Sequence, residues 1–272
     1  MQSDCFADPF IEKRFHIIAD YKEFLWVHTT TPLITAARLP DERLLHILSN
    51  LDFLEISVGG YDQESYLNLC GVNAFDVLMV QLRRIKKIIQ EYHLHIDVAM
   101  AFRTYDKDKL VSSNTYKELT TMFRDGGIID NFFSWFGSIK LSDLPAGAKL
   151  RVSDNSIKVE DCVVPNATLA IQANGNVVGC GCIDWLNSVI IGNVHTTPLL
   201  DIWNSSEAVA FRKAFSSKHS IPAICQECGL YSSVAIFRNT CFKNYNSRQG
   251  LYYVVGNQPS ENFLTRIRKC LG

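Results

Sequence analysis

Four cysteines in the second half of the chain, Cys162, Cys180, Cys225 and Cys228, are spaced like the ligands of one metal centre. Cys225 and Cys228 form a CxxC pair, and such a pair binds one site from a single turn because its two sulfurs point the same way. The other two are distant, since 17 residues separate Cys162 from Cys180 and 44 separate Cys180 from Cys225. We therefore expect a fold that brings separate segments to the CxxC pair, in a metal or iron–sulfur protein.

The residues alone leave the nature of this centre open. Four thiolates suit an iron–sulfur cluster, and they equally suit a structural zinc ion. Cys182 is either a substitute for Cys180 as ligand or its buried neighbour. The chain has nine cysteines, an odd number, and most of them lie in the second half. This favours metal ligation in a reducing compartment over a disulfide framework. We interpret the remaining thiols as buried or incidental, namely Cys5, Cys70, Cys241 and Cys270.

The charge balance argues against two classes of partner. The chain has 27 Lys and Arg against 28 Asp and Glu, so no strong net field attracts nucleic acid or an anionic membrane. It contains no apolar run long enough to span a bilayer, and its first residues lack the features of a secretory signal. We expect a cytoplasmic protein with neither nucleic acid nor a membrane as partner.

Up to about residue 150, short apolar strands alternate with amphipathic helices, which predicts repeated βα units and a parallel sheet. The clearest helix runs over 75–92, where apolar residues recur at steps of three and four. Its basic residues lie largely off this stripe and are interpreted as a solvated outer face, in preference to a phosphate contact: Arg83, Arg84, Lys86 and Lys87. Other expected elements are helices after Pro9, from Pro40 and over 106–123, strands at 24–27, 53–58 and 96–102, and a loop at 29–32.

After about residue 150 the pattern changes to short strands, short helices and most of the cysteines, so we predict two domains, 1–150 and 151–272. Asn174-Gly175, between alternating segments at 168–172 and 176–179, predicts a hairpin with a two-residue turn and positive φ at both positions. This hairpin would carry Cys180 to a fixed place. Helices are expected over 198–203 and 206–215.

The second half resembles the auxiliary-cluster domain of radical S-adenosylmethionine (SAM) enzymes, called SPASM in its long form and twitch in its short form. The matching features are Cys162, the segments 174–180, 191–194 and 199–205, Arg212, and Ile221-Pro222 ahead of the CxxC pair. The next cysteine after that pair is only Cys241, so the resemblance is to the one-cluster version, and the spacing is most similar to that of radical dehydrogenases of aminocyclitol alcohols. It implies one 4Fe–4S cluster bound by Cys162, Cys180, Cys225 and Cys228.

The first half resembles the later part of a radical SAM partial barrel. The matching segments are Asp8-Pro9-Phe10, the stretch 29–33, which is similar to a Thr-Asn-Gly loop, and 54–60 with Glu64 and Tyr66, which is similar to the fourth strand. The expected fold is therefore α/β: an incomplete (βα) partial barrel followed by a small α+β SPASM/twitch domain. The resemblance implies S-adenosylmethionine as a cofactor and places Ser57 near its ribose.

Two motifs of the family are not preserved. CxxxCxxC, which holds the cluster that cleaves S-adenosylmethionine, occurs nowhere in the sequence, and the Gly-Gly-Glu motif would fall at 2–5, where it is not preserved. We therefore expect either an N-terminally truncated enzyme or a relic that retains the auxiliary cluster, with no cleavage of S-adenosylmethionine by this chain alone. The implied role is electron transfer or substrate anchoring during radical modification of a small molecule or peptide, with flavodoxin or ferredoxin as electron donor. The alternative is a non-catalytic zinc- or cluster-binding module.

Overall fold

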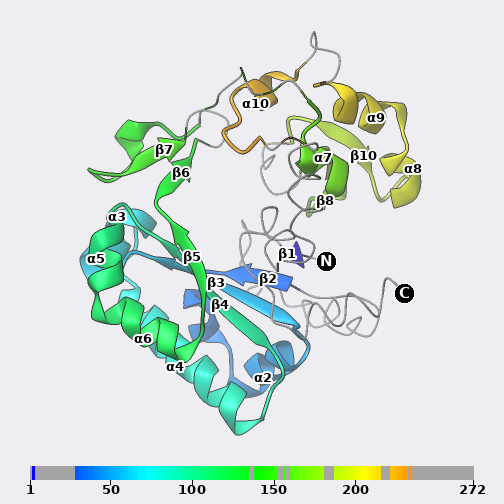
Figure 1. Ribbon diagram of the computed structural model, residues 1–272. Coiled ribbons are helices and arrows are strands. Elements are labelled where there is room, and N and C mark those ends of the chain that lie inside the picture. Colours follow the sequence, from blue (N-terminus) through cyan, green and yellow to red (C-terminus); the bar gives the residue numbers. More distant parts are fainter. Residues whose placement is uncertain are drawn as a thin grey trace, which may run out of the picture. The chain divides into compact units, whose positions relative to one another are not determined.

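The computed structural model describes residues 2–3, 28–134, 138–151, 153, 156, 158, 160–180, 187–215, 221–231 and 233. The described residues form two compact units, one within 1–131 and 144–149 and the other within 132–143 and 150–233 (Figure 1). The helix expected after Pro9 and the strand expected at 24–27 lie outside the described residues. Within the parts described, no helix is long and apolar enough to cross a membrane.

The first unit is built on a five-stranded sheet in which every described pairing is parallel, as the βα pattern predicted. The order of the strands in space follows their order in the sequence: β1 (Gln2–Ser3), β2 (His28–Thr31), β3 (Phe53–Gly59), β4 (Asp97–Arg103) and β5 (Arg124–Ile129). The expected strands at 53–58 and 96–102 are confirmed as β3 and β4.

The loop expected at 29–32 is wrong for its three threonines, which belong to β2. Thr29, Thr30 and Thr31 pair in register with Leu54, Glu55 and Ile56 of β3. Threonine is β-branched and suits an extended strand beside a central neighbour. The segment is polar and therefore resembles a loop in the sequence. Its pairing with β3 cannot be predicted from the sequence alone.

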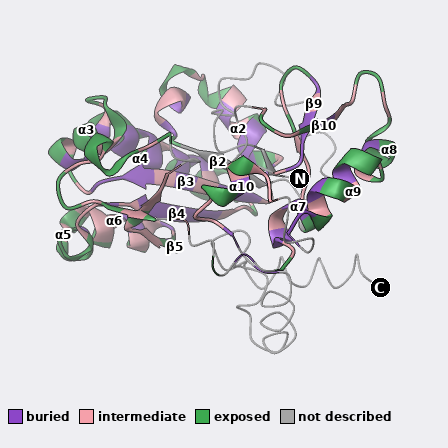
Figure 2. Cartoon of the chain, turned by 90° about the horizontal axis from the view of Figure 1, so that it is seen from above, coloured by how far each residue is buried: buried purple, intermediate pink, exposed green. Residues whose placement is uncertain are grey.

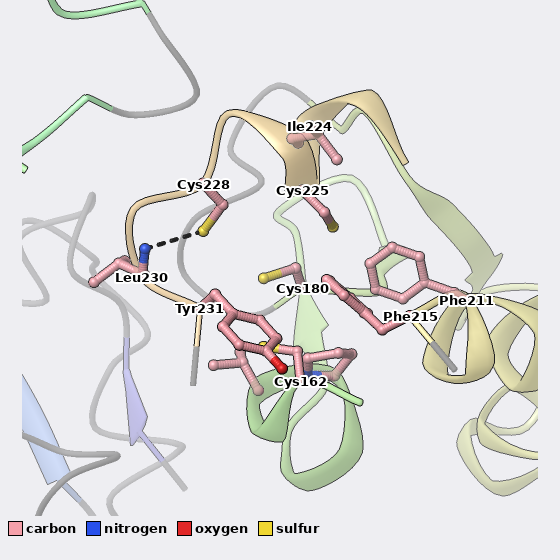
Figure 3. Close-up of a pocket in the computed structure, with 11 residues that line it drawn as sticks. Cys162, Cys180, Phe211, Phe215, Ile224, Cys225, Cys228, Leu230 and Tyr231 are labelled. Carbon is pink, nitrogen blue, oxygen red and sulfur yellow. Dashed lines mark hydrogen bonds between the residues drawn. The ribbon is translucent and has the colours of Figure 1, made fainter. Parts of the chain in front are cut away.

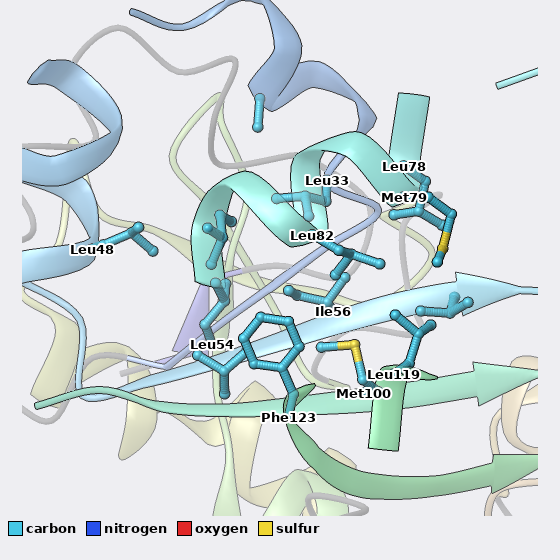
Figure 4. Packing of buried hydrophobic residues seen from close by; sticks show 14 of the residues in the cluster. Leu33, Leu48, Leu54, Ile56, Leu78, Met79, Leu82, Met100, Leu119 and Phe123 are labelled. Carbon is cyan, nitrogen blue, oxygen red and sulfur yellow. The ribbon is translucent and has the colours of Figure 1, made fainter. Parts of the chain in front are cut away.

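Helices pack against one face of this sheet, on a core that Figure 4 shows from close by. Leu54, Ile56 and Val58 of β3 are 0% exposed and meet Leu78 and Leu82 of the long helix α4. Figure 2 shows the same burial along the inner sides of the helices. The elements on this side are η1 (Ile34–Arg38), α2 (Asp41–Ser49), α3 (Gln63–Cys70), α4 (Phe75–Glu91), α5 (Lys107–Ser112) and α6 (Asn114–Met122).

The helices expected from Pro40 and over 75–92 are confirmed as α2 and α4. The single helix expected over 106–123 is wrong, because the chain divides there into α5 and α6. The break is at Ser113, whose hydroxyl accepts a hydrogen bond from the Tyr116 N–H at 3.0 Å and so caps a new helix. The hydroxyl of a serine can bond to nearby backbone groups, which favours serine at the start of a helix over serine inside one.

The basic residues of α4 are not simply a solvated face. Arg84 donates to a carboxylate oxygen of Asp41 at 2.7 Å and to the Leu39 carbonyl at 2.7 Å. Arg83 pairs with Glu118, and Lys86 donates to the Met122 carbonyl at 2.6 Å. Three of the four therefore connect α4 to neighbouring segments, a structural role that the periodicity could not reveal.

The second unit contains a three-stranded antiparallel sheet of order β10-β9-β8, formed by β8 (Ala170–Ile171), β9 (Asn176–Val178) and β10 (Ile190–Asn193). Short helices accompany it: α7 (Val163–Ala167), α8 (Leu199–Trp203), α9 (Ser206–Lys213) and α10 (Ala223–Gln226). The expected helices over 198–203 and 206–215 are confirmed as α8 and α9. The remaining elements are η2 (Leu141–Asp143) and the paired strands β6 (Asn131–Phe133) and β7 (Lys149–Arg151).

The hairpin between β8 and β9 is confirmed, but its turn differs from the one expected. Gly175 has φ +83°, whereas Asn174 is not among the residues with positive φ. The Gly175 N–H donates to the Gln172 carbonyl at 2.9 Å, and the Gln172 N–H donates to the Asn176 carbonyl at 2.8 Å. The loop therefore has three residues, 173–175, and a single left-handed glycine closes it.

Candidate metal centre

One apolar pocket of the second unit is lined by all four of the cysteines that the sequence singled out (Figure 3). Figure 3 shows Cys225 and Cys228 on one side of the pocket and Cys162 and Cys180 on the other. Much of the remaining wall is aromatic or aliphatic and includes Phe211, Phe215 and Tyr231. Residues as far apart in the sequence as Cys162 and Cys228, which are separated by 66 positions, thus line the same pocket.

Each cysteine is placed by a local element. Cys162 is the residue before α7 and forms an isolated antiparallel bridge with Ser233. Cys180 lies two residues after β9, at the end of the hairpin. Cys225 belongs to the single turn of α10, and its carbonyl accepts a hydrogen bond from the Cys228 N–H at 3.3 Å. That turn holds the CxxC pair together.

None of these four cysteines forms a disulfide bond, and Cys162 and Cys225 are only 7% and 8% exposed. In the described part of the chain, however, no three His, Cys, Asp or Glu side chains are gathered in a way that would hold a metal ion. One tetrahedral zinc at about 2.3 Å from each sulfur needs sulfurs about 3.8 Å apart. The thiols therefore share a pocket without forming a preassembled site for a single ion.

The charge state of Cys228 is set by competing effects. Burial raises the pKa of its thiol, while hydrogen bonding from backbone N–H groups and the charge of Lys158 act in the opposite direction. The Leu230 N–H lies 3.2 Å from the sulfur and donates to it. A bound cation would drive deprotonation of such a thiol, and the N–H would then stabilise the thiolate.

The structure adds two contacts near this pocket that the sequence did not indicate. Lys158 is a buried cation whose ammonium donates to the Cys225 carbonyl at 2.7 Å. Gly179 lies so close to Phe211 that an added Cβ would come 2.6 Å from the ring. Neither contact has a local signal, because each joins residues more than 30 positions apart.

The other candidate residues lie elsewhere. Ser57 is half-buried in β3 of the first unit and pairs in register with Ala101. It alternates with Ile56 and Val58, so it faces the side of the sheet opposite the helices. Cys70 is an exposed residue of α3. The proposed alternative ligand Cys182 lies outside the described residues, as do Cys5, Cys241 and Cys270.

Comparison with known proteins identifies the region around this pocket. Residues 162–229 match SPASM, an iron–sulfur cluster-binding domain. The chain is also 27% identical over 124 residues to S-adenosyl-L-methionine-dependent 2-deoxy-scyllo-inosamine dehydrogenase from Niallia circulans, an alignment covering 45% of this chain and 40% of that enzyme. The matched region thus spans two fifths of the relative's length. By its cysteine motif and both similarities, the chain is similar to radical S-adenosylmethionine/SPASM proteins.

Proposed function

We propose that Cys162, Cys180, Cys225 and Cys228 bind one 4Fe–4S cluster, and that the cluster serves a radical SAM reaction on a small molecule or peptide. The observation that carries this proposal is the convergence of all four thiols on one pocket. The match of residues 162–229 to a cluster-binding domain supports it independently.

An iron–sulfur cluster suits this pocket better than zinc. The four candidate ligands are all thiols, which suit both groups. The match of residues 162–229 to an iron–sulfur cluster-binding domain favours a cluster over zinc. The apolar wall also matches a redox centre whose potential depends on exclusion of water.

The chain's own residues have distinct tasks in this proposal. The four thiolates hold the cluster, which when bound supplies one-electron transfer or an anchoring point for substrate. The Leu230 N–H donates to Cys228 and stabilises negative charge on that sulfur. Phe211, Phe215 and Tyr231 keep water from the pocket.

We assign the first unit to part of a (βα) barrel. A parallel sheet in sequential order, with helices packed on one face, supports this assignment. Ser57 is assigned to the ribose of S-adenosylmethionine because it faces the opposite side of the sheet and lies in the segment similar to the family's fourth strand. The named relative is S-adenosylmethionine-dependent, which supports this cofactor. We further propose flavodoxin or ferredoxin as electron donor and a cytoplasmic location.

The test is anaerobic reconstitution of the purified protein with iron and sulfide. The proposal predicts about four irons and four sulfides per chain, a broad visible absorption and a paramagnetic signal after reduction. A colourless protein that binds one zinc and retains no iron would overturn it in favour of the non-catalytic zinc module.

A further inference from the structure

Lys158 is a charged side chain that is almost completely removed from solvent. It is 3% exposed, although lysine is rarely buried without a compensating partner. Its ammonium donates to the carbonyls of Cys225 at 2.7 Å and Gln226 at 2.8 Å, and also to the Ser153 hydroxyl. These partners are neutral dipoles. Among the residues that the structure describes, no carboxylate forms an ion pair with Lys158.

Removing an ammonium from water is costly, and neutral acceptors offset only part of that cost. A nearby anion would offset much more. Burial lowers the pKa of Lys158, whereas the charges of Cys228, Cys225, Glu227 and Cys162 act in the opposite direction. Among the described residues the site therefore has a fixed cation that forms no direct ion pair, beside thiols that become thiolates when they bind metal.

The two carbonyls that receive these hydrogen bonds fix where the charge lies. Both belong to the last two residues of α10, and Cys225 is itself a member of the CxxC pair. The ammonium is thus hydrogen-bonded to the turn that carries Cys225 and that ends two residues before Cys228. Arg151 also acts on Cys228, but it is exposed, so water screens its charge.

We propose that Lys158 is a positioning residue that holds a positive charge against the cluster and raises its reduction potential. This inference rests on the proposed function, since it requires a cluster in the pocket. A 4Fe–4S cluster with four thiolates is anionic and gains one further negative charge when it accepts an electron. A buried cation therefore stabilises the reduced form more than the oxidised form, and the low dielectric around it strengthens the effect.

The experiment compares cluster potentials in the reconstituted full-length chain. Lys158→Met removes both the charge and the donor, whereas Lys158→Gln removes the charge and keeps N–H donors for the carbonyls. Lys213→Met is the matched control, because Lys213 is an exposed lysine in the same unit. Each protein is titrated anaerobically with dithionite and mediators, and the reduced cluster is followed by paramagnetic resonance.

The expected result is a lower potential in both Lys158 variants and no change in the control. We expect the equilibrium constant for one-electron reduction to fall at least tenfold, which corresponds to about 59 mV. Iron analysis of the wild-type protein separates the two proposals: failure to bind a cluster refutes the proposed function. A cluster with the same potential in wild type and both variants refutes only the role of Lys158. Loss of the fold or of the cluster in both variants would also overturn it, by showing that this lysine serves to build the site.

Discussion

Replacing Gly179 by alanine should disturb the cysteine pocket through one identifiable contact. A Cβ at this position would lie 2.6 Å from Cδ1 and 2.8 Å from Cε1 of Phe211. Carbon atoms in favourable contact are about 3.5–4.0 Å apart, so the ring must shift by about 1 Å. Phe211 is only 7% exposed and lines the pocket with the cysteines, so little space is available for that shift. Overpacking of this kind costs about 1–3 kcal/mol.

The assay is urea unfolding of the metal-free protein under reducing conditions, followed by circular dichroism. Gly179→Ala should lower the free energy of unfolding by about 1–3 kcal/mol. The control is the double variant Gly179→Ala/Phe211→Leu, in which a smaller side chain relieves the contact. Its destabilisation should be at least about 1 kcal/mol less than the sum of the two single variants. Strictly additive effects would refute the idea that the ring contact is the cause.

Two further predictions concern the first unit. Asp62 caps α3 by accepting from the Ser65 N–H at 2.8 Å, so Asp62→Ala should lower the free energy of unfolding by about 1 kcal/mol; an unchanged urea midpoint would contradict the cap. The hydrogen bond from the Tyr116 hydroxyl to Asp125 raises the pKa of Tyr116 to about 12. The pKa of tyrosine in the unfolded chain is about 10, so this stabilisation is fully present below that pH and is lost as the pH rises toward 12. In a spectroscopic titration, Asp125→Asn should bring the Tyr116 pKa down, and an unaltered titration would show that Asp125 is not responsible.

The regular part of the first unit was predictable because its signals are local. The 3.6-residue period of α4 predicts a helix, and the apolar runs of β3 and β4 predict strands, without reference to other segments. The missed features depend on other segments or on single residues. β2 requires β3 as its neighbour, and the break between α5 and α6 depends on the hydroxyl of Ser113.

The candidate site also has some features that the sequence predicts and others that it does not. The cysteine spacing and the surrounding motifs indicated which four thiols to consider, and the structure adds that they line one pocket. Their role as ligands, like the role of Ser57, stays a prediction. Lys158 could not have been predicted, because its contact with the Cys225 carbonyl spans 67 positions and leaves no periodic trace.

The most direct test of the central claim is the iron content of four single variants, Cys162→Ser, Cys180→Ser, Cys225→Ser and Cys228→Ser, after anaerobic reconstitution. Cys70→Ser is the matched control, because Cys70 is an exposed thiol in the other unit. The account predicts about four irons per chain in the wild type and the control, and a marked loss of iron or an altered cluster spectrum in each of the four. Full iron content and an unchanged spectrum in all four variants would contradict it.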